Sequence, residues 1–196
     1  MRAKTAGTNK ITGANAGGPP RLRIRMHPSA RIAQFGRPRA SKQDQKALAV
    51  WAADCAEHVL SCFEATYPND NRPRNAIEAC RAWARTGVFK MAEVRRDSLA
   101  AHAAARAAEA DTAARFAARA AGQAVATAHV ASHAVGAAWY GVKAAEAAGV
   151  SGEREWQYRR LPKHLRYFIL QLSEERPALA RILRYPTAQF NEGACT

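Results

Sequence analysis

Two histidines in the segment AHVASHA have a spacing that suits a chemical role. If a helix runs through this segment, residues four apart share one face, so the rings of His129 and His133 lie together. Such a pair can bind a metal, although Val130 stands where an HExxH motif has its general base. A third ligand would come from another helix, from Asp54, His58 or His102. Hydrogen-bonded imidazoles that fill space between alanines, or a polar partner-binding network, explain the same pattern, and we predict no metal site.

A second group of ionisable side chains falls in the segment WAADCAEH, where Asp54 stands among apolar neighbours. A buried carboxylate needs a cation or hydrogen-bond donors, because an unpaired charge is costly in the protein interior. The candidate partners are Arg81, Arg85, Arg106 and a histidine. Cys55 and His58 superficially suggest a cysteine hydrolase, but no oxyanion donor or orienting third group accompanies them. The sequence therefore predicts a structural ion pair and no catalytic set.

The segment RAWAR places one tryptophan, Trp83, between two arginines, Arg81 and Arg85. These residue types dominate the binding energy of protein interfaces. The segment is also typical of a core tryptophan with an arginine extending to solvent on either side. The sequence has no phosphate-binding glycine loop, no nucleophile elbow and no signature of paired catalytic carboxylates, so we predict neither nucleotide-dependent nor hydrolytic chemistry, and no cofactor.

The four cysteines do not form a disulfide framework. Cys55 and Cys62 are seven residues apart on one predicted helix, which is about 10 Å by helical rise, whereas a disulfide needs Cα atoms within about 7 Å. Cys80 falls on the next helix and Cys195 in the tail, and no CxxC spacing suggests zinc. We expect buried free thiols in a reducing cytosol.

The elements that position these residues are all predicted to be helices, because apolar residues recur at helical spacing and no segment alternates like a strand. Ser41 with Asp44, Asp70 or Asn71, and Asp111 supply N-caps. The predicted helices span residues 41–66, 71–87, 90–109, 112–148 (with kinks at Gly122, Gly136 and Gly141), 151–161 and 164–172, and a short one follows Pro177.

Half of the residues from Leu99 to Ala148 are alanine. Alanine is the best helix former and adds little bulk, so helices here can pack near the short end of the usual range of about 8–10 Å. No repeat of solenoid length is present. The predicted fold class is all-α: a compact bundle of about five to seven helices with long alanine-rich helices and a disordered basic N-terminal arm.

The net charge of +14 is concentrated in that arm. Residues 1–40 contain nine Lys or Arg and no acidic residue, whereas residues 41–150 contribute +2 and residues 151–196 contribute +3. A basic arm attracts any polyanion weakly and without sequence preference, but Phe35 is its one aromatic residue, so a solvated tail is the simpler interpretation. No apolar run has the length of a signal peptide or a membrane span, which indicates a cytoplasmic protein without a membrane partner. Met26 is an alternative first residue.

Four segments carry a resemblance to one bacterial family. They are WAADCAEHVLSCFEATYPNDNRPRNAIEACRAWAR (51–85), SLAAHAAARAA (98–108), ARAAGQAVATAHVASHAVGAAWYGVKAA (118–145) and EWQYRRLPKHL (155–165). Together they resemble the Imm-five-like family of immunity proteins from polymorphic-toxin systems, over about residues 44–170. The resemblance implies a small helical cytoplasmic protein that protects its host by binding a toxin. The positions that match the family's recurrent polar pattern are Trp51, Asp54, Cys55, Arg72, Arg74, Glu78, Arg81, Trp83, His102, Arg106, His129, His133 and Trp156.

These observations predict a non-enzymatic immunity-type protein that neutralises a cognate toxin through one face of its bundle. We expect one helical domain over residues 41–185, between the disordered arm (1–40) and a flexible tail (186–196). The residues expected to bind the partner or to form an internal polar network are Trp51, Asp54, Arg81, Trp83, Arg85, His102, Arg106, His129, His133 and Trp156. Two alternatives are a nucleic-acid-associated helical protein that binds through the arm, and a metal-binding helical protein that uses His102, His129 and His133.

Overall fold

The computed structural model describes residues 39–174, and these residues form an all-α protein without a β-strand, as predicted. Seven of their helices are longer than one turn: α2 (Lys42–His58), α4 (Arg72–Thr86), α5 (Met91–Ala107), α6 (Thr112–Ala126), α7 (His133–Ala147), α8 (Glu153–Arg160) and α9 (Arg166–Glu174). The single-turn helix α3 (Ser61–Glu64) follows α2, and the 3₁₀-helix η1 (Lys163–Leu165) precedes α9. The predicted arm up to residue 38, the predicted helix after Pro177 and the predicted tail lie outside the described residues.

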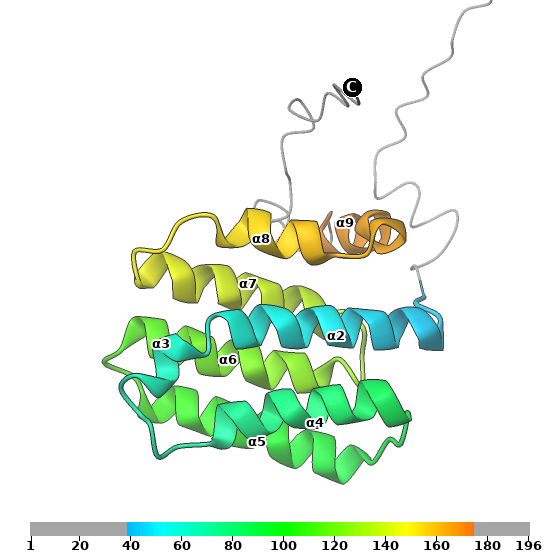
Figure 1. Cartoon of the computed structure of the whole chain (residues 1–196). Coiled ribbons are helices and arrows are strands. Elements are labelled where there is room, and N and C mark those ends of the chain that lie inside the picture. Colours follow the sequence, from blue (N-terminus) through cyan, green and yellow to red (C-terminus); the bar gives the residue numbers. More distant parts are fainter. Residues whose placement is uncertain (1–38, 175–196) are drawn as a thin grey trace, which may run out of the picture.

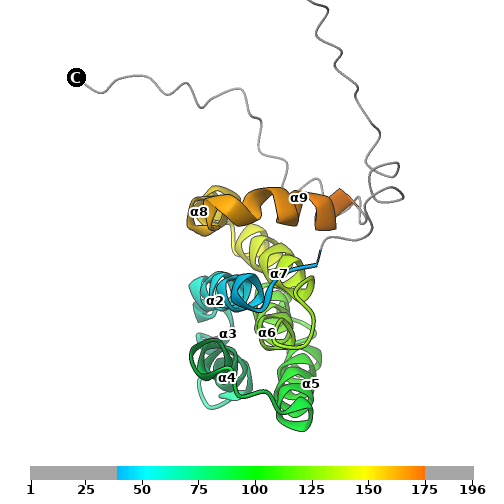
Figure 2. The same ribbon diagram turned by 90° about the vertical axis from the view of Figure 1, so that its right-hand side faces the viewer.

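The helices form two layers and a cap. Helices α5, α6 and α7 lie side by side in one layer. Helices α2 and α4 form the second layer, which packs against one face of the first (Figure 1, Figure 2). Helices α8 and α9 lie over α7, at the end of the stack opposite α5 (Figure 1). Helix α6 is central, because it contacts α2, α3, α4, α5 and α7.

Small side chains explain how α6 can have so many neighbours. Its buried residues are alanine except for one glycine and one valine. Because these side chains have little bulk, the surrounding helices can approach closely. Larger residues of α2 and α4, such as Leu48, Trp51 and Ile77, fill the remaining core. A second apolar cluster around Phe63 closes the end of the bundle near α3.

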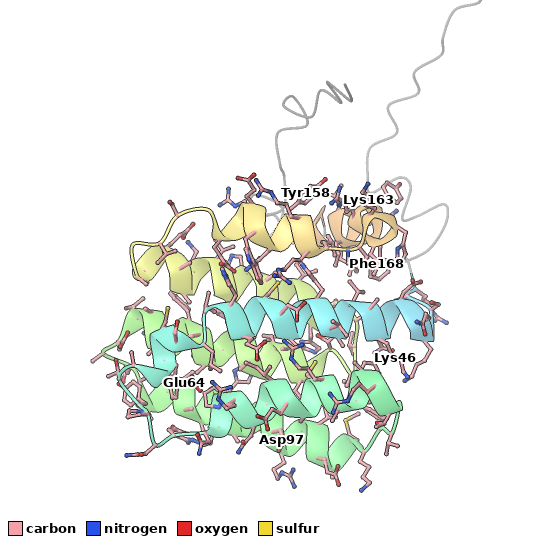
Figure 3. The ribbon with its side chains drawn as sticks, in the orientation of Figure 1. Lys46, Glu64, Asp97, Tyr158, Lys163 and Phe168 are labelled. Atoms are coloured by element: carbon pink, nitrogen blue, oxygen red, sulfur yellow. The ribbon has the colours of Figure 1, made fainter. Side chains whose placement is uncertain are left out.

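Several predicted helix ends are confirmed by their capping interactions. Oγ of Ser41 and Oδ1 of Asp111 each accept a hydrogen bond of 3.0 Å from a backbone N–H in the first turn of α2 and α6. Helix α4 ends at Thr86 and is capped by Gly87, whose φ of 72° is a left-handed conformation that favours glycine. Lys46 lies beside this end of α4 (Figure 3), where its positive charge complements the helix dipole.

The prediction of one helix over residues 112–148 is wrong, because α6 ends at Ala126 and α7 begins at His133. The cause lies in α2, where Nε2 of Gln45 donates hydrogen bonds to the backbone carbonyls of Thr127 (2.9 Å) and Ala128 (3.1 Å). In a continuing helix these carbonyls would accept from the following turn. The side chain of Gln45 satisfies them instead, and α7 folds back along α6.

The glycines expected to kink this segment lie inside helices and admit neighbouring side chains. The distances from a Cβ built on each glycine to the nearest side chain are 2.9 Å for Gly122 and His102, 2.8 Å for Gly136 and Gln123, and 2.7 Å for Gly141 and Gln157. Each glycine therefore marks a close approach between helices and not a kink.

The predicted helix over residues 41–66 is also interrupted. Helix α2 ends at His58, Val59 and Leu60 form a turn, and α3 adds a single helical turn. Leu60 is part of the main core, whereas Val59 packs with Phe63 in the second cluster. The turn allows neighbouring apolar residues to reach two separate clusters, which a continuous helix face would not.

Beyond α7 the chain follows the predicted break at proline. Helix α8 ends at Arg160, before Pro162, and η1 and α9 follow. Within residues 39–174, no helix combines the length and the apolar character that crossing a membrane requires.

Three cysteines lie within the described residues, and all are free thiols, as predicted. Cys55 and Cys80 are buried, but Cys62 is half-buried, which corrects the expectation that every thiol is buried. Cys195 lies outside the described residues.

Candidate functional site

A pocket of about 400 Å³ opens at one end of the α5–α6–α7 layer, and we call it the end pocket. It lies between the first half of α5 and the turn from α6 to α7. Its lining includes Met91, Val94, Arg95, Leu99, His129 and His133. Leu99 is 53% exposed and Met91 45%, so the rim presents large apolar side chains to solvent. Clustered exposed apolar groups of this kind are typical of binding surfaces.

Both histidines of the AHVASHA segment border the end pocket, but the prediction that they share a helix face is wrong. His129 lies in the turn, and its ring stacks on that of Phe89 with centroids 6.5 Å apart. His133 is the first residue of α7, and its Nδ1 donates to Oε1 of Gln123 at 2.7 Å. The turn that separates the two rings follows from the hydrogen bonds of Gln45 at the end of α6.

The histidines are not gathered into a metal centre. In the part of the chain that the structure describes, no group of three or more His, Cys, Asp or Glu side chains is placed to hold a metal ion. The third ligand that the sequence suggested at Asp54, His58 or His102 is therefore not supplied by these residues.

His102 lies where α5 meets α6, with its ring across Gly122. Burial is the main cause that lowers the pKa of His102 below its ordinary value, and the positive charges of Arg119 and Arg106 lower it further. His133 from α7 acts in the same direction. His102 is therefore held as a neutral imidazole in basic surroundings.

These basic surroundings extend over the exposed side of the layer, which we call the basic face. Residues 112–145 contain no Asp or Glu, and on this side α6 carries half-buried residues spaced by four, namely Arg115, Arg119 and Gln123. The basic face consists of Arg95, His102, Arg106, Arg115, Arg119 and His133. Phe116 and Tyr140 lie among the arginines, with their ring centroids 6.0 Å apart.

Asp54 forms the ion pair that the sequence predicts, and Arg81 is its partner. Nη2 of Arg81 donates to Oδ1 of Asp54 at 2.9 Å and to Oε2 of Glu57 at 2.5 Å, which links α4 to α2. Arg81 and Arg85 also line a polar groove of about 770 Å³ between α4 and α5. Asp97 of α5 lies at this α4–α5 edge of the bundle (Figure 3).

Two of the predicted tryptophans are core residues. Trp51 is buried, and its Nε1 donates to the backbone carbonyl of Gln157 at 2.8 Å, which ties α2 to α8. Trp83 is buried on α4 with Nζ of Lys42 4.9 Å from its ring centroid. Of the two interpretations of the RAWAR segment, the structure therefore supports the core tryptophan.

A buried polar network joins α8 to α2 and α7. Glu153 is 4% exposed and Gln157 1%, and Nε2 of Gln157 donates to Oε1 of Glu153 at 2.7 Å and to the carbonyl of Ala138 at 3.1 Å. Nδ1 of His58 lies 2.5 Å from Oε2 of Glu153, and the ring of His58 stacks on that of Trp156 at 3.7 Å. Sequence reasoning missed Glu153 and Gln157. Their four-residue spacing, which puts two polar side chains on one face of α8, is the signal that could have found them.

The buried thiols are not set up as nucleophiles. Burial raises the pKa of Cys55 well above its ordinary value, and the neighbouring carboxylate of Glu153 raises it further. Burial likewise raises the pKa of Cys80 to about 12, and its Sγ donates to the carbonyls of Ala49 and Ala124. A thiol that keeps its proton is a poor nucleophile, so the pairing of Cys55 with His58 does not resemble a cysteine hydrolase.

The ten residues predicted from the sequence therefore divide into two groups. Those on the basic face or at the end pocket are His102, Arg106, His129 and His133. Those on α2, α4 and α8 are Trp51, Asp54, Arg81, Trp83, Arg85 and Trp156. The second group mainly ties helices together, whereas His129 and His133 of the first group border the exposed apolar residues of the end pocket.

A family profile described as "Imm-5 like putative immunity protein" matches residues 39–164. No curated protein and no solved structure matches the chain significantly. The match runs from the start of α2 into η1, so it includes the basic face, the end pocket and all ten predicted residues. Because the profile covers more than half of the sequence, the chain belongs to the Imm-5 like immunity protein family.

Proposed function

We propose that this protein is an immunity protein that neutralises a cognate bacterial toxin by binding it directly. Membership of the Imm-5 like family carries the proposal. The end pocket supports it, because a partner protein can seat a side chain there against exposed apolar residues of α5. A few such anchors, and not the total area, supply most of the binding energy in protein complexes.

The apolar surface around the end pocket is larger than its lining. Val88 and Phe89 precede α5, and Val130 lies in the turn between α6 and α7. All three are exposed, as are Met91 and Leu99 on α5. Covering these side chains with a partner would remove apolar area from water, which is the main favourable contribution to most protein associations.

A toxin co-expression assay tests the proposal. The full chain is expressed together with a candidate toxin domain from the same genetic locus, and growth reports protection. Leu99→Asp places a charge at the rim of the end pocket, and Val150→Asp is its matched control, because Val150 is 54% exposed and lies at the other end of α7. Circular dichroism verifies that both variants fold.

We expect the unchanged chain and Val150→Asp to protect and Leu99→Asp to lose protection. A folded, unchanged chain that neither binds the toxin domain nor protects against it would contradict the proposal. The nucleic-acid alternative concerns residues 1–40, almost all outside the described residues. Deletion of this arm would abolish DNA or RNA retention at low salt on that alternative, whereas toxin neutralisation would survive on ours.

A further inference from the structure

The charges of α5 are sorted between its two sides. Asp97 lines the groove toward α4, together with Arg96, its ion-pair partner. Arg95, His102 and Arg106 follow one another at intervals of seven and four residues, which places them on a single helix face. That face is turned toward α6, because His102 crosses Gly122 and Arg95 shares the end pocket with the last turn of α6.

Helix α6 extends this positive surface without adding a carboxylate. Arg115 and Arg119 lie over the rings of Phe116 and Tyr140, with the guanidinium carbon 5.2 Å and 5.9 Å from the ring centroids. Stacking of this kind holds a guanidinium in place while its N–H groups stay available. The nearest acidic residues along the chain are confined to the turn between α5 and α6 and to the end of α7.

The exposed arginines of α5 are not neutralised within the described residues. Arg95 and Arg106 are exposed, and neither forms an ion pair with any residue in 39–174. By contrast, Arg81 on the other layer is shared by two carboxylates. The basic face therefore presents positive charge that the carboxylates of the bundle itself do not cancel.

We propose that the toxin docks on the basic face, and that the toxin surface it accepts is acidic and places a bulky apolar side chain in the end pocket. This inference rests on the proposed function and adds the docking face and the chemistry of the partner. The end pocket opens at one end of the basic face, where Arg95 and Leu99 are one helical turn apart. Complementary charge around an apolar anchor steers and orients the encounter of two proteins.

Charge reversal at matched positions tests the inference. Arg95→Glu and Arg106→Glu each reverse an exposed cation of the basic face that has no ion-pair partner among residues 39–174, and Arg106→Gln removes the charge without adding repulsion. Arg85→Glu is the control, because Arg85 is exposed on α4 and also forms no ion pair within the described residues. Binding of the full chain to the toxin domain that it protects against in the co-expression assay is measured by calorimetry at low and at high salt.

We expect Arg95→Glu and Arg106→Glu to weaken binding about tenfold or more at low salt, with a smaller loss for Arg106→Gln and little change for Arg85→Glu. High salt should weaken the unchanged complex and reduce these differences, because screening acts on exposed charges.

Three other outcomes would overturn the inference. If the toxin domain binds but Arg85→Glu weakens this binding as much as Arg106→Glu does, or if the affinity does not depend on salt, the docking face is elsewhere while the proposed function stands. If the unchanged chain does not bind the toxin domain, the proposed function fails and the inference fails with it. If Arg106→Glu abolishes binding of a short DNA duplex and leaves toxin binding unchanged, the basic face serves nucleic acid.

Discussion

Replacing Gly141 with alanine should destabilise the bundle, although alanine is the better helix former. Gly141 lies in the middle of α7, and a Cβ at this position would be 2.7 Å from Nε2 of Gln157. Gln157 is buried, so its amide has no solvent-filled space into which it can move. The backbone carbonyl of Cys55 lies 3.3 Å from the same Cβ position and restricts a compensating shift of α7.

The size of the effect follows from the hydrogen bonds that the displaced amide loses. Nε2 of Gln157 donates to the carbonyl of Ala138 and to the carboxylate of Glu153. Each lost bond costs about 1 kcal/mol, and a buried acceptor left without its donor costs a further ~1–3 kcal/mol. The glycine-to-alanine change returns about 1 kcal/mol of helix propensity. We expect the free energy of unfolding to fall by about 2–4 kcal/mol.

Urea unfolding of the full chain, followed by circular dichroism, measures this change. The control is the same substitution in a Gln157→Ala background, where the new methyl group has room. There Gly141→Ala should be neutral or should stabilise the protein by up to about 1 kcal/mol. Unchanged or higher stability for Gly141→Ala alone would refute the close packing of α7 on α8. An equal loss in both backgrounds would show that the cost does not arise at Gln157.

Three further substitutions or treatments test other parts of the structure. Burial, and then the charge of Arg119, lower the pKa of His102 in the folded protein, so the unfolded chain takes up this proton first as the pH falls. The free energy of unfolding should therefore decrease as the pH falls below about 6.5. Measured by urea unfolding at neutral and at mildly acidic pH, this decrease should be smaller for His102→Gln than for the unchanged chain, and equal decreases would contradict the prediction. Gln45→Ala removes both hydrogen bonds to the carbonyls after α6, so unfolding should become easier by about 1–2 kcal/mol, with faster amide exchange in the turn, and unchanged stability would argue against the cap. A thiol reagent with peptide mapping should modify the half-buried Cys62 before Cys80, and Cys80 only on unfolding, because burial raises the pKa of Cys80 to about 12. Early modification of Cys80 would count against its burial.

The helix ends show which parts of this fold a sequence can predict. The caps at Ser41 and Asp111 involve a backbone N–H three residues away, so the local pattern is sufficient to predict them. The end of α6 depends on Gln45, which is more than 80 residues from the carbonyls that it binds. Residues 127–132, between α6 and α7, contain neither glycine nor proline, so the local sequence gives no strong signal that ends the helix there.

In the candidate site, too, the sequence predicts the role of some residues and not of others. The need of Asp54 for a cation follows from its apolar neighbours, and Arg81 was among the few arginines that could supply it. Glu153 has no apolar neighbours in the sequence, and its four-residue spacing from Gln157 is a weak signal, because a glutamate in the first turn of a short polar helix is also typical of an exposed residue. Its burial depends on the packing of α8 against α7, where the missing side chain of Gly141 leaves room for Gln157.

The alanine-rich core has a consequence for how such a protein can be matched to its toxin. Helix α6 buries almost only alanine, so its larger residues, Arg115, Phe116, Arg119 and Gln123, all fall on the one side that is not packed against α2 and α4. Arg115 and Arg119 are half-buried on this side, outside the core, where substitutions usually change stability by about 0.5 kcal/mol or less. Charges on this side can therefore change while the buried alanines, and with them the helix spacing, stay the same. If the toxin docks on the basic face as proposed, specificity and stability are carried by opposite sides of the same helix, so variants that change toxin preference should unfold at nearly the same urea concentration.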